Sequence, residues 1–200
     1  MSFEFLHRTE ILMGEDTVKS FHNKKVAVYG LGGVGATAAV DLLRTGVGTL
    51  LVFDFDIISI SNLNRLVLGF RNNLGRNKTD VLKETAGLIN PEAHIISSEL
   101  FMKGRDASSC IPEDADFHID AIDSLNPKVN LIKTLRKKQL PFVSVMGTAG
   151  RLFPEKMKIS QMKDTDVCPL ARVVRKRLRR IKTPLDFPVV WSDEKPVPPV

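Results

Sequence analysis

The chain has 200 residues, a net charge of +6 and 43% hydrophobic residues. This length suits one domain, or one domain with an appendage, and the composition is that of a globular protein with a sizeable core. No run approaches the roughly 18 apolar residues of a membrane span, and the first residues do not read as a secretory signal. Two cysteines, Cys110 and Cys168, are too few for a disulfide framework or a four-cysteine zinc site, so we expect a reduced, cytoplasmic protein.

The first predicted element is a helix over residues 9–22, which Thr9 can cap and which carries apolar residues at roughly helical spacing. Arg8 lies just ahead of this helix, on an exposed arm. Its position alone indicates only a solvated terminal charge.

A glycine-rich turn follows a predicted strand over 26–29 and precedes a predicted helix over 36–44. It reads Gly30-Leu31-Gly32-Gly33-Val34-Gly35, and a second strand over 50–53 then ends on Asp54. Glycines allow close approach of a phosphate, the helix start offers free N–H groups, and an acid at this spacing can bind ribose hydroxyls. The order strand, turn, helix, strand, acid therefore predicts a nucleotide site. The alternative is that the glycines only close a tight turn.

The next stretch places polar residues beside that turn. After Asp54-Phe55-Asp56, a short helix is expected from residue 61 or 62 to about residue 70, and it carries Asn62 and Arg65. A longer helix is predicted over 74–89, with Lys78 near its start. Asn90-Pro91 ends it, because the residue before a proline is disfavoured in the helical region.

The remaining elements continue the alternation of strands and helices. We predict strands over 94–98, 117–123 and 141–146, a helix over 127–138 and a loop over 103–116. Residues 152–153 and 156–162 are expected to form a hairpin on the sheet edge. Residues 169–182 read as an amphipathic helix. The proline-rich end, 183–200, is expected to be irregular, with the sequence PVVWS docking as a short strand or crossover.

This alternation predicts an α/β protein of Rossmann-like class. Its sheet should be mostly parallel and doubly wound, with helices on both faces and extra antiparallel edge strands. We expect two parts: residues 1–165 as a nucleotide-binding domain with an N-terminal helical arm, and 166–200 as a basic helix with a proline-rich segment. Asp54, Asp123 and Gly147 follow strand ends, so we expect them to converge on one crevice.

Three residues favour a triphosphate over a dinucleotide. Arg65 and Lys78 would supply charge compensation that an NAD site does not need, and Asp123 is placed to bind Mg²⁺ through one carboxylate. Each also has an ordinary explanation: the cations could be solvated helix charges, and Asp123 could cap the following helix.

The segment 172–182 holds seven basic residues and no acid, while the rest of the chain is close to neutral. A solvated helix face would explain a charge run in general. Without compensating acids, binding to the phosphates of a nucleic acid is favoured here. The cations in question are Arg172, Arg175, Lys176, Arg177, Arg179 and Arg180.

Taken together, GLGGVG, DFD, SNLNR with a lysine thirteen residues on, and DAIDS resemble the ubiquitin-activating-enzyme-like adenylyltransferases of ThiF and MoeB type. The resemblance covers about residues 8–162. It implies that Arg8 is an arginine finger reaching the ATP of the other subunit of a homodimer. It also implies that the remaining roles fall to Gly30, Gly32 and Gly33 at the phosphates, Asp54 at the ribose with Asp56 beside it, Asn62, Arg65 and Lys78 at the triphosphate, and Asp123 at Mg²⁺.

Within the family, the sequence is most similar to the branch of tRNA threonylcarbamoyladenosine dehydratases. The features are R-T-E-x-L-x-G at the start, D-A-I-D-S-x-x-P-K, D-x-x-P-L-A before the basic helix, and VVWSDEKP. This implies ATP-dependent cyclisation of a modified adenosine in tRNA through adenylation of its carboxylate, with a sulfur-transfer helper protein as a further partner. The alternatives are adenylation of a ubiquitin-like sulfur carrier, an NAD-dependent oxidoreductase, and a binding protein without turnover.

Overall fold

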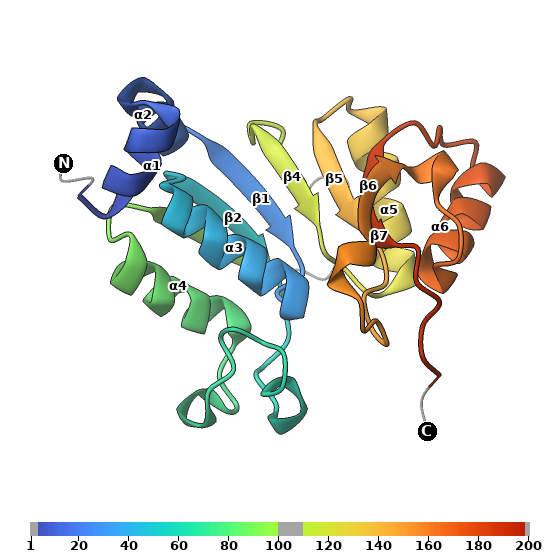
Figure 1. Ribbon diagram of the computed structural model, residues 1–200, viewed down its shortest axis with the longest axis horizontal. Coiled ribbons are helices and arrows are strands. Elements are labelled where there is room, and N and C mark those ends of the chain that lie inside the picture. Colours follow the sequence, from blue (N-terminus) through green and yellow to red (C-terminus); the bar gives the residue numbers. More distant parts are fainter. Residues whose placement is uncertain (1–3, 100–109, 199–200) are drawn as a thin grey trace. The chain divides into compact units, whose positions relative to one another are not determined.

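The computed structural model describes residues 4–99 and 110–198 (Figure 1). Its strands follow the order β3-β2-β1-β4-β5-β7-β6 in a seven-stranded sheet. The described residues divide into two compact units, the first made of residues up to 99 with 114–117, and the second of 110–113 with 118–198. Residues 103–109, the first half of the loop predicted over 103–116, lie outside the described residues.

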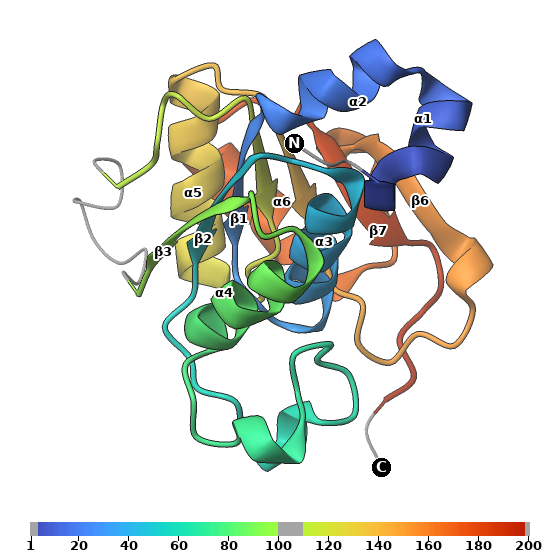
Figure 2. The same cartoon turned by 90° about the vertical axis from the view of Figure 1, so that its left-hand side faces the viewer.

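Three parallel strands form the sheet of the first unit: β1 (Lys25–Tyr29), β2 (Thr49–Phe53) and β3 (His94–Ser98). Helices α3 (Gly33–Thr45) and α4 (Lys78–Ile89) lie next to one another on one face of these strands (Figures 1 and 2). Strands β1 and β2 are buried, largely apolar runs, as expected for the interior of a parallel sheet, whereas β3 is largely exposed. Each predicted strand of this unit is found within one residue of its expected bounds.

The N-terminal segment forms two helices rather than the single one predicted over 9–22. A 3-10 turn (Glu4–Leu6) leads into α1 (His7–Met13) and α2 (Glu15–His22). Gly14 separates them with φ of +85°, a conformation that a helix cannot continue through. The segment is anchored to the sheet by Leu6, which is buried, and by the Phe21 carbonyl, which accepts the Gly48 N–H at 3.2 Å.

The segment between β2 and α4 contradicts the short helix predicted from residue 61 or 62 to about 70. It holds two 3-10 turns, Ile60–Asn62 and Arg71–Asn73, joined by irregular turns. An antiparallel bridge between Ile57 and Asn77 closes the segment at its base. Helix α4 then begins at Lys78, four residues later than predicted, because Gly75 has φ of +81°.

The second unit is also built on a sheet, with β4 (Phe117–Asp120), β5 (Phe142–Val145) and β7 (Pro188–Ser192) parallel. Strand β6 (Met157–Gln161) pairs antiparallel with β7. Helices α5 (Leu125–Lys137) and α6 (Pro169–Arg180) pack against each other. Because β7 lies between β5 and β6, part of the proline-rich end belongs to the sheet.

The edge hairpin predicted from 152–153 and 156–162 is wrong in its pairing. Strand β6 pairs with β7, from residue 188 onward, whereas the Leu152 and Phe153 N–H groups donate to the carboxylate of Glu194. The predicted class is confirmed, since the sheet is mostly parallel, flanked by helices and bordered by an antiparallel pair. Within residues 4–99 and 110–198, none of the helices is both long and apolar enough to cross a membrane.

Candidate functional site

The glycine turn joins the end of β1 to the start of α3. Gly30 has φ of +89°, and its N–H donates to the Phe53 carbonyl of β2 at 2.8 Å. Gly32 precedes the helix, and a Cβ atom built there would meet no described atom within 4 Å. In the described chain no side chain caps α3, so its first N–H groups and its positive dipole end are available to an anion.

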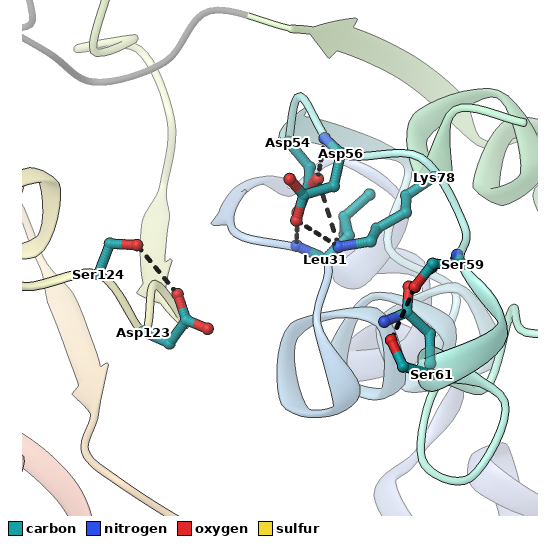
Figure 3. A network of polar contacts seen from close by, with 9 residues as sticks. Leu31, Asp54, Asp56, Ser59, Ser61, Lys78, Asp123 and Ser124 are labelled. Atoms are coloured by element: carbon teal, nitrogen blue, oxygen red, sulfur yellow. Dashed lines mark hydrogen bonds and ion pairs between the residues drawn. The ribbon is translucent and has the colours of Figure 1, made fainter. Parts of the chain in front are cut away.

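Two aspartates and a lysine stand next to this turn (Figure 3). Asp54, almost fully buried, accepts the Leu31 N–H at 2.5 Å and the Asp56 N–H at 2.8 Å. The Lys78 ammonium lies between the carboxylates, 2.7 Å from Asp56 Oδ2 and 3.7 Å from Asp54 Oδ1. The turn, the end of β2 and the start of α4 are therefore joined by one charged network.

Lys78 reaches this network because the segment between β2 and α4 ends beside the residues with which it begins. The Lys78 N–H donates to the Asp56 carbonyl at 3.1 Å, and the bridge of Ile57 to Asn77 lies next to that bond. The lysine side chain is 7% exposed. A cation that is this buried and held by two acids is pre-organised, so its charge is available to a phosphate at little cost in side-chain entropy.

Arg65 and Asn62 lie on the irregular turns of the same segment. Arg65 packs over the turn, since a Cβ atom on Gly33 would be 3.3 Å from its carbonyl oxygen and 3.4 Å from its Cγ. Its Nη1 donates to the Ser61 carbonyl at 2.8 Å. The Asn62 side-chain oxygen accepts the Ser59 N–H at 3.1 Å, so the amide nitrogen is the group that can face a ligand. The structure thus brings both residues to the glycine turn without the predicted helix.

Arg8 is not near the glycine turn of its own chain. It lies on α1, which is held to the first unit beside Gly46 and Gly48, where β2 begins. The glycine turn follows the opposite, carboxyl end of β1. A five-residue strand separates the two ends by about 16 Å. The Arg8 side chain is exposed.

Asp123 follows β4 in the second unit, and its side chain is exposed. The Ser124 hydroxyl donates to its Oδ1 at 3.2 Å (Figure 3). No group of three or more metal-ligating side chains occurs in the described residues. A lone carboxylate with free lone pairs nevertheless fits Mg²⁺, which takes one or two carboxylates together with phosphate oxygens and water.

A buried ion pair, to which the sequence analysis assigned no role, supports the turn that carries Asp123. The Lys128 ammonium donates to Asp120 Oδ2 at 2.7 Å, and both side chains are fully buried. The Ser144 hydroxyl donates to the same oxygen at 2.5 Å, and the Ile122 N–H donates to the other at 3.1 Å. Burial lowers the pKa of Lys128, and Asp120 opposes that shift.

The signal for this pair was present in the motif, because Asp120 and Lys128 frame D-A-I-D-S-x-x-P-K. Their pairing could not be read from it, since it requires the strand to end at residue 120 and the helix to turn its first lysine inward. Strand β4 does end there, three residues before the predicted end.

Helix α6 carries the predicted nucleic-acid-binding cations in two different environments. Arg175 is partly buried, and its Nη1 donates to the carbonyl of Thr165 at 2.5 Å and to the Thr165 hydroxyl. Ala171, Val174 and Leu178 form the buried face. The other five predicted cations are exposed, namely Arg172, Lys176, Arg177, Arg179 and Arg180.

Comparison with known proteins places this geometry in a family. The model of the ThiF family matches residues 6–166. The tRNA threonylcarbamoyladenosine dehydratase of Bacillus subtilis is 34% identical over 190 residues, which are 95% of this chain and 75% of the relative. The protein of the same name from Escherichia coli is 34% identical over 186 residues, 93% of this chain and 68% of the relative.

The fold agrees with the sequence comparison. The crystal structure of the E. coli tRNA N6-threonylcarbamoyladenosine dehydratase in complex with ATP superimposes with a TM-score of 0.93 at 32% identity. The match covers 98% of this chain and 84% of that one.

Proposed function

The chain belongs to the ThiF family, and from that premise we propose that it uses ATP to dehydrate threonylcarbamoyladenosine in tRNA by adenylating the carboxylate of the modified base. The observation that carries the proposal is the similarity to two dehydratases over nearly the whole chain. The uncapped start of α3, with Lys78 and Arg65 beside it, is the kind of surface that binds a triphosphate.

In the proposed reaction, a carboxylate oxygen of the substrate attacks the α-phosphorus of ATP and pyrophosphate leaves. The resulting acyl-adenylate is then attacked at its acyl carbon from within the same side chain, and AMP leaves. The net change in the substrate is the loss of one water. No protein nucleophile is required, because the attacking atom is already held close to the acyl carbon.

The residues of the first unit would bind and orient the nucleotide. We assign the phosphates to the glycine turn (Gly30, Gly32, Gly33) and to Asn62, Arg65 and Lys78. Asp54 would accept hydrogen bonds from the ribose hydroxyls. Asp56 would hold the Lys78 ammonium in place through its 2.7 Å contact. Fixed cations stabilise the charge that develops on the departing pyrophosphate.

Mg²⁺ is part of the proposal, with Asp123 as its ligand. When bound, the ion would neutralise charge on the phosphate oxygens. The contribution of the chain is to fix the turn that carries Asp123. The buried bonds of Asp120 to Lys128, Ser144 and the Ile122 N–H supply that rigidity.

We further propose a homodimer in which Arg8 acts on the ATP of the other subunit. Two observations support this. About 16 Å of strand lies between the place where α1 is attached and the glycine turn of the same chain. In addition, Ile11 and Leu12 on α1 are 66% and 84% exposed, and Ile60 and Phe70 near the turn are 69% and 62% exposed. Exposed apolar residues in such groups are typical of protein interfaces.

The exposed cations of α6 are proposed to bind tRNA phosphates. A cytoplasmic location and a sulfur-transfer helper protein stay predictions from the family resemblance.

The proposal is tested by ATP-dependent release of pyrophosphate in the presence of bulk tRNA that carries threonylcarbamoyladenosine. We expect stimulation by this tRNA and not by tRNA lacking the modification. Asp123→Ala should lower the stimulated rate by at least about 100-fold, because removing a group that stabilises the transition state typically costs several kcal/mol. Asp164→Ala, at another exposed carboxylate of the second unit, is the matched control and should keep the parent rate.

Pyrophosphate release that depends on a small carrier protein ending in Gly-Gly, and not on tRNA, would replace the proposal with the sulfur-carrier alternative. ATP binding without pyrophosphate release in either assay would point to a binding protein without turnover.

A further inference from the structure

Arg151 has a partly buried guanidinium group, two nitrogen atoms of which have no partner among the described residues. Its Nε and Nη1 atoms are inaccessible to solvent and make no hydrogen bond within residues 4–99 and 110–198. No carboxylate of the described chain lies within ion-pair distance of it. Burying a charged group without a partner is unfavourable, so native proteins pair such groups with protein atoms, water or a ligand.

The backbone around Arg151 is held in place on both sides. The Glu194 carboxylate accepts the Leu152 and Phe153 N–H groups at 3.0 Å and 3.1 Å. The Val197 N–H donates to the Gly150 carbonyl at 2.8 Å. An arginine on such a loop loses less conformational freedom on binding than one on a mobile loop.

Glu194, the acid that holds this loop, forms no ion pair with Arg151. Glu194 is occupied by the two N–H groups of the loop. Burial works against its ionisation, but those hydrogen bonds and the charges of Lys156 and Arg151 outweigh it, so the pKa of Glu194 is lowered. Arg151 therefore interacts with the Glu194 carboxylate through its charge, but its Nε and Nη1 donors make no hydrogen bond to it.

The position of Arg151 in the fold is one where parallel sheets bind ligands. It follows β5 after a short glycine-containing turn, at the carboxyl end of the strand. Strand β4 runs beside β5 with Asp120 opposite Ser144, so the turn that carries Asp123 leaves the same edge of this sheet.

We propose that Arg151 binds an oxyanion of the tRNA substrate, either the carboxylate of its threonylcarbamoyl group or a backbone phosphate. Guanidinium groups are suited to both, because their planar donors match two oxygens at once. The inference rests on the proposed function, and it adds a substrate-binding residue that lies apart from the glycine turn and from α6.

The stability of a variant separates a ligand-binding arginine from a structural one. Because the buried donors of Arg151 have no partner among the residues that the structure describes, Arg151→Met should keep the thermal midpoint of the parent or raise it. A midpoint lowered by more than about 5 °C would assign Arg151 a structural role and overturn the inference.

Binding is measured for tRNA that carries threonylcarbamoyladenosine, over a series of salt concentrations, with the full chain. Arg151→Met should weaken binding by about 10- to 100-fold, the range for losing a charged hydrogen bond, and Arg151→Lys should restore part of it. Lys158→Met is the matched control, since this exposed cation pairs with Asp193 in the same unit. It should leave the affinity unchanged.

A second probe identifies the oxyanion. Free N6-threonylcarbamoyladenosine has the carboxylate but no phosphate. If Arg151→Met abolishes its competition against tRNA-stimulated pyrophosphate release, the carboxylate is the ligand. If the competition is unchanged while the salt slope of tRNA binding falls by about 0.7–0.9, the ligand is a phosphate.

Two further outcomes are distinct. If the parent protein binds the tRNA and Arg151→Met binds it equally well, the inference is wrong and the proposed function stands. If the parent itself binds no tRNA, the proposed function fails, and this inference fails with it.

Discussion

At the scale of single residues, His118 shows how burial sets a pH dependence. It lies on β4 with a side chain that is fully buried. Burial lowers the pKa of His118 from 6.5 to about 4. The folded protein therefore holds this imidazole neutral at pH values where the unfolded chain takes up a proton.

We expect the free energy of unfolding to fall as the pH is lowered below about 6.5. In this range the unfolded state binds more protons than the folded state, so stability decreases with decreasing pH until about pH 4. Between pH 6.5 and 5 the loss should be at most about 2 kcal/mol. Urea unfolding at pH 7 and pH 5 measures it, and the carboxylates with lowered pKa values lose their contribution to stability mainly below pH 5.

His118→Gln should remove most of this pH dependence, whatever its effect on stability at pH 7. His94→Gln, at an exposed position on β3, is the control and should keep the parent dependence. An unchanged slope in the His118 variant would show that another group is responsible.

At the scale of elements, α6 carries one arginine that is bonded within the fold and several cations that are exposed. Its apolar residues are buried within the second unit, and Arg175 joins the helix to Thr165 through hydrogen bonds. The exposed cations have no such role. Seven basic residues within eleven repel each other, so the helix is less stable at low salt unless anions are bound.

Removing two exposed charges should weaken tRNA binding without unfolding the helix. For Arg177→Gln with Arg180→Gln, we expect the slope of log affinity against log salt to fall by about 1.4–1.8. Arg175→Gln is the comparison: it should lower the thermal midpoint, because Thr165 loses its partner, and leave the slope near that of the parent. The reverse pattern would mean that Arg175, and not the exposed pair, meets the phosphates.

At the scale of the whole molecule, the active unit is proposed to be a dimer. The first unit has exposed apolar residues both on α1 and near the glycine turn. In a two-fold dimer, the α1 surface of each copy can meet the surface near the glycine turn of its partner. Both Arg8 side chains would then reach a nucleotide site.

Mixing two inactive variants tests this arrangement. Arg8→Ala and Lys78→Ala should each lose pyrophosphate release, since each removes a cation from the proposed site. When they are mixed as equal amounts and allowed to exchange, half of the dimers carry one intact site, so we expect about a quarter of the parent rate. No recovery, with subunit exchange shown independently, would mean that Arg8 acts on its own chain or not at all.

The sequence by itself determined the alternation of elements and the nucleotide-binding turn. The apolar pattern located β1, β2, α3 and α6, because each buries a continuous or helical set of apolar residues. The glycine pattern marked the turn that we propose binds phosphate, since that role depends on backbone freedom that only glycine gives. These features depend on residues that are close together in the chain, so they can be predicted from a single sequence.

Only the tertiary structure decided which side chains meet. The contact between Lys78 and Asp56 spans 22 residues, that between Asp120 and Ser144 spans 24, and β6 finds β7 instead of its neighbour in sequence. Arg175 differs from Arg177 by the face of α6 that it occupies. Arg151 is distinguished by buried donors that no atom of residues 4–99 and 110–198 accepts. These pairings depend on how the segments pack, because hydrogen bonds between distant residues carry no pattern along the chain.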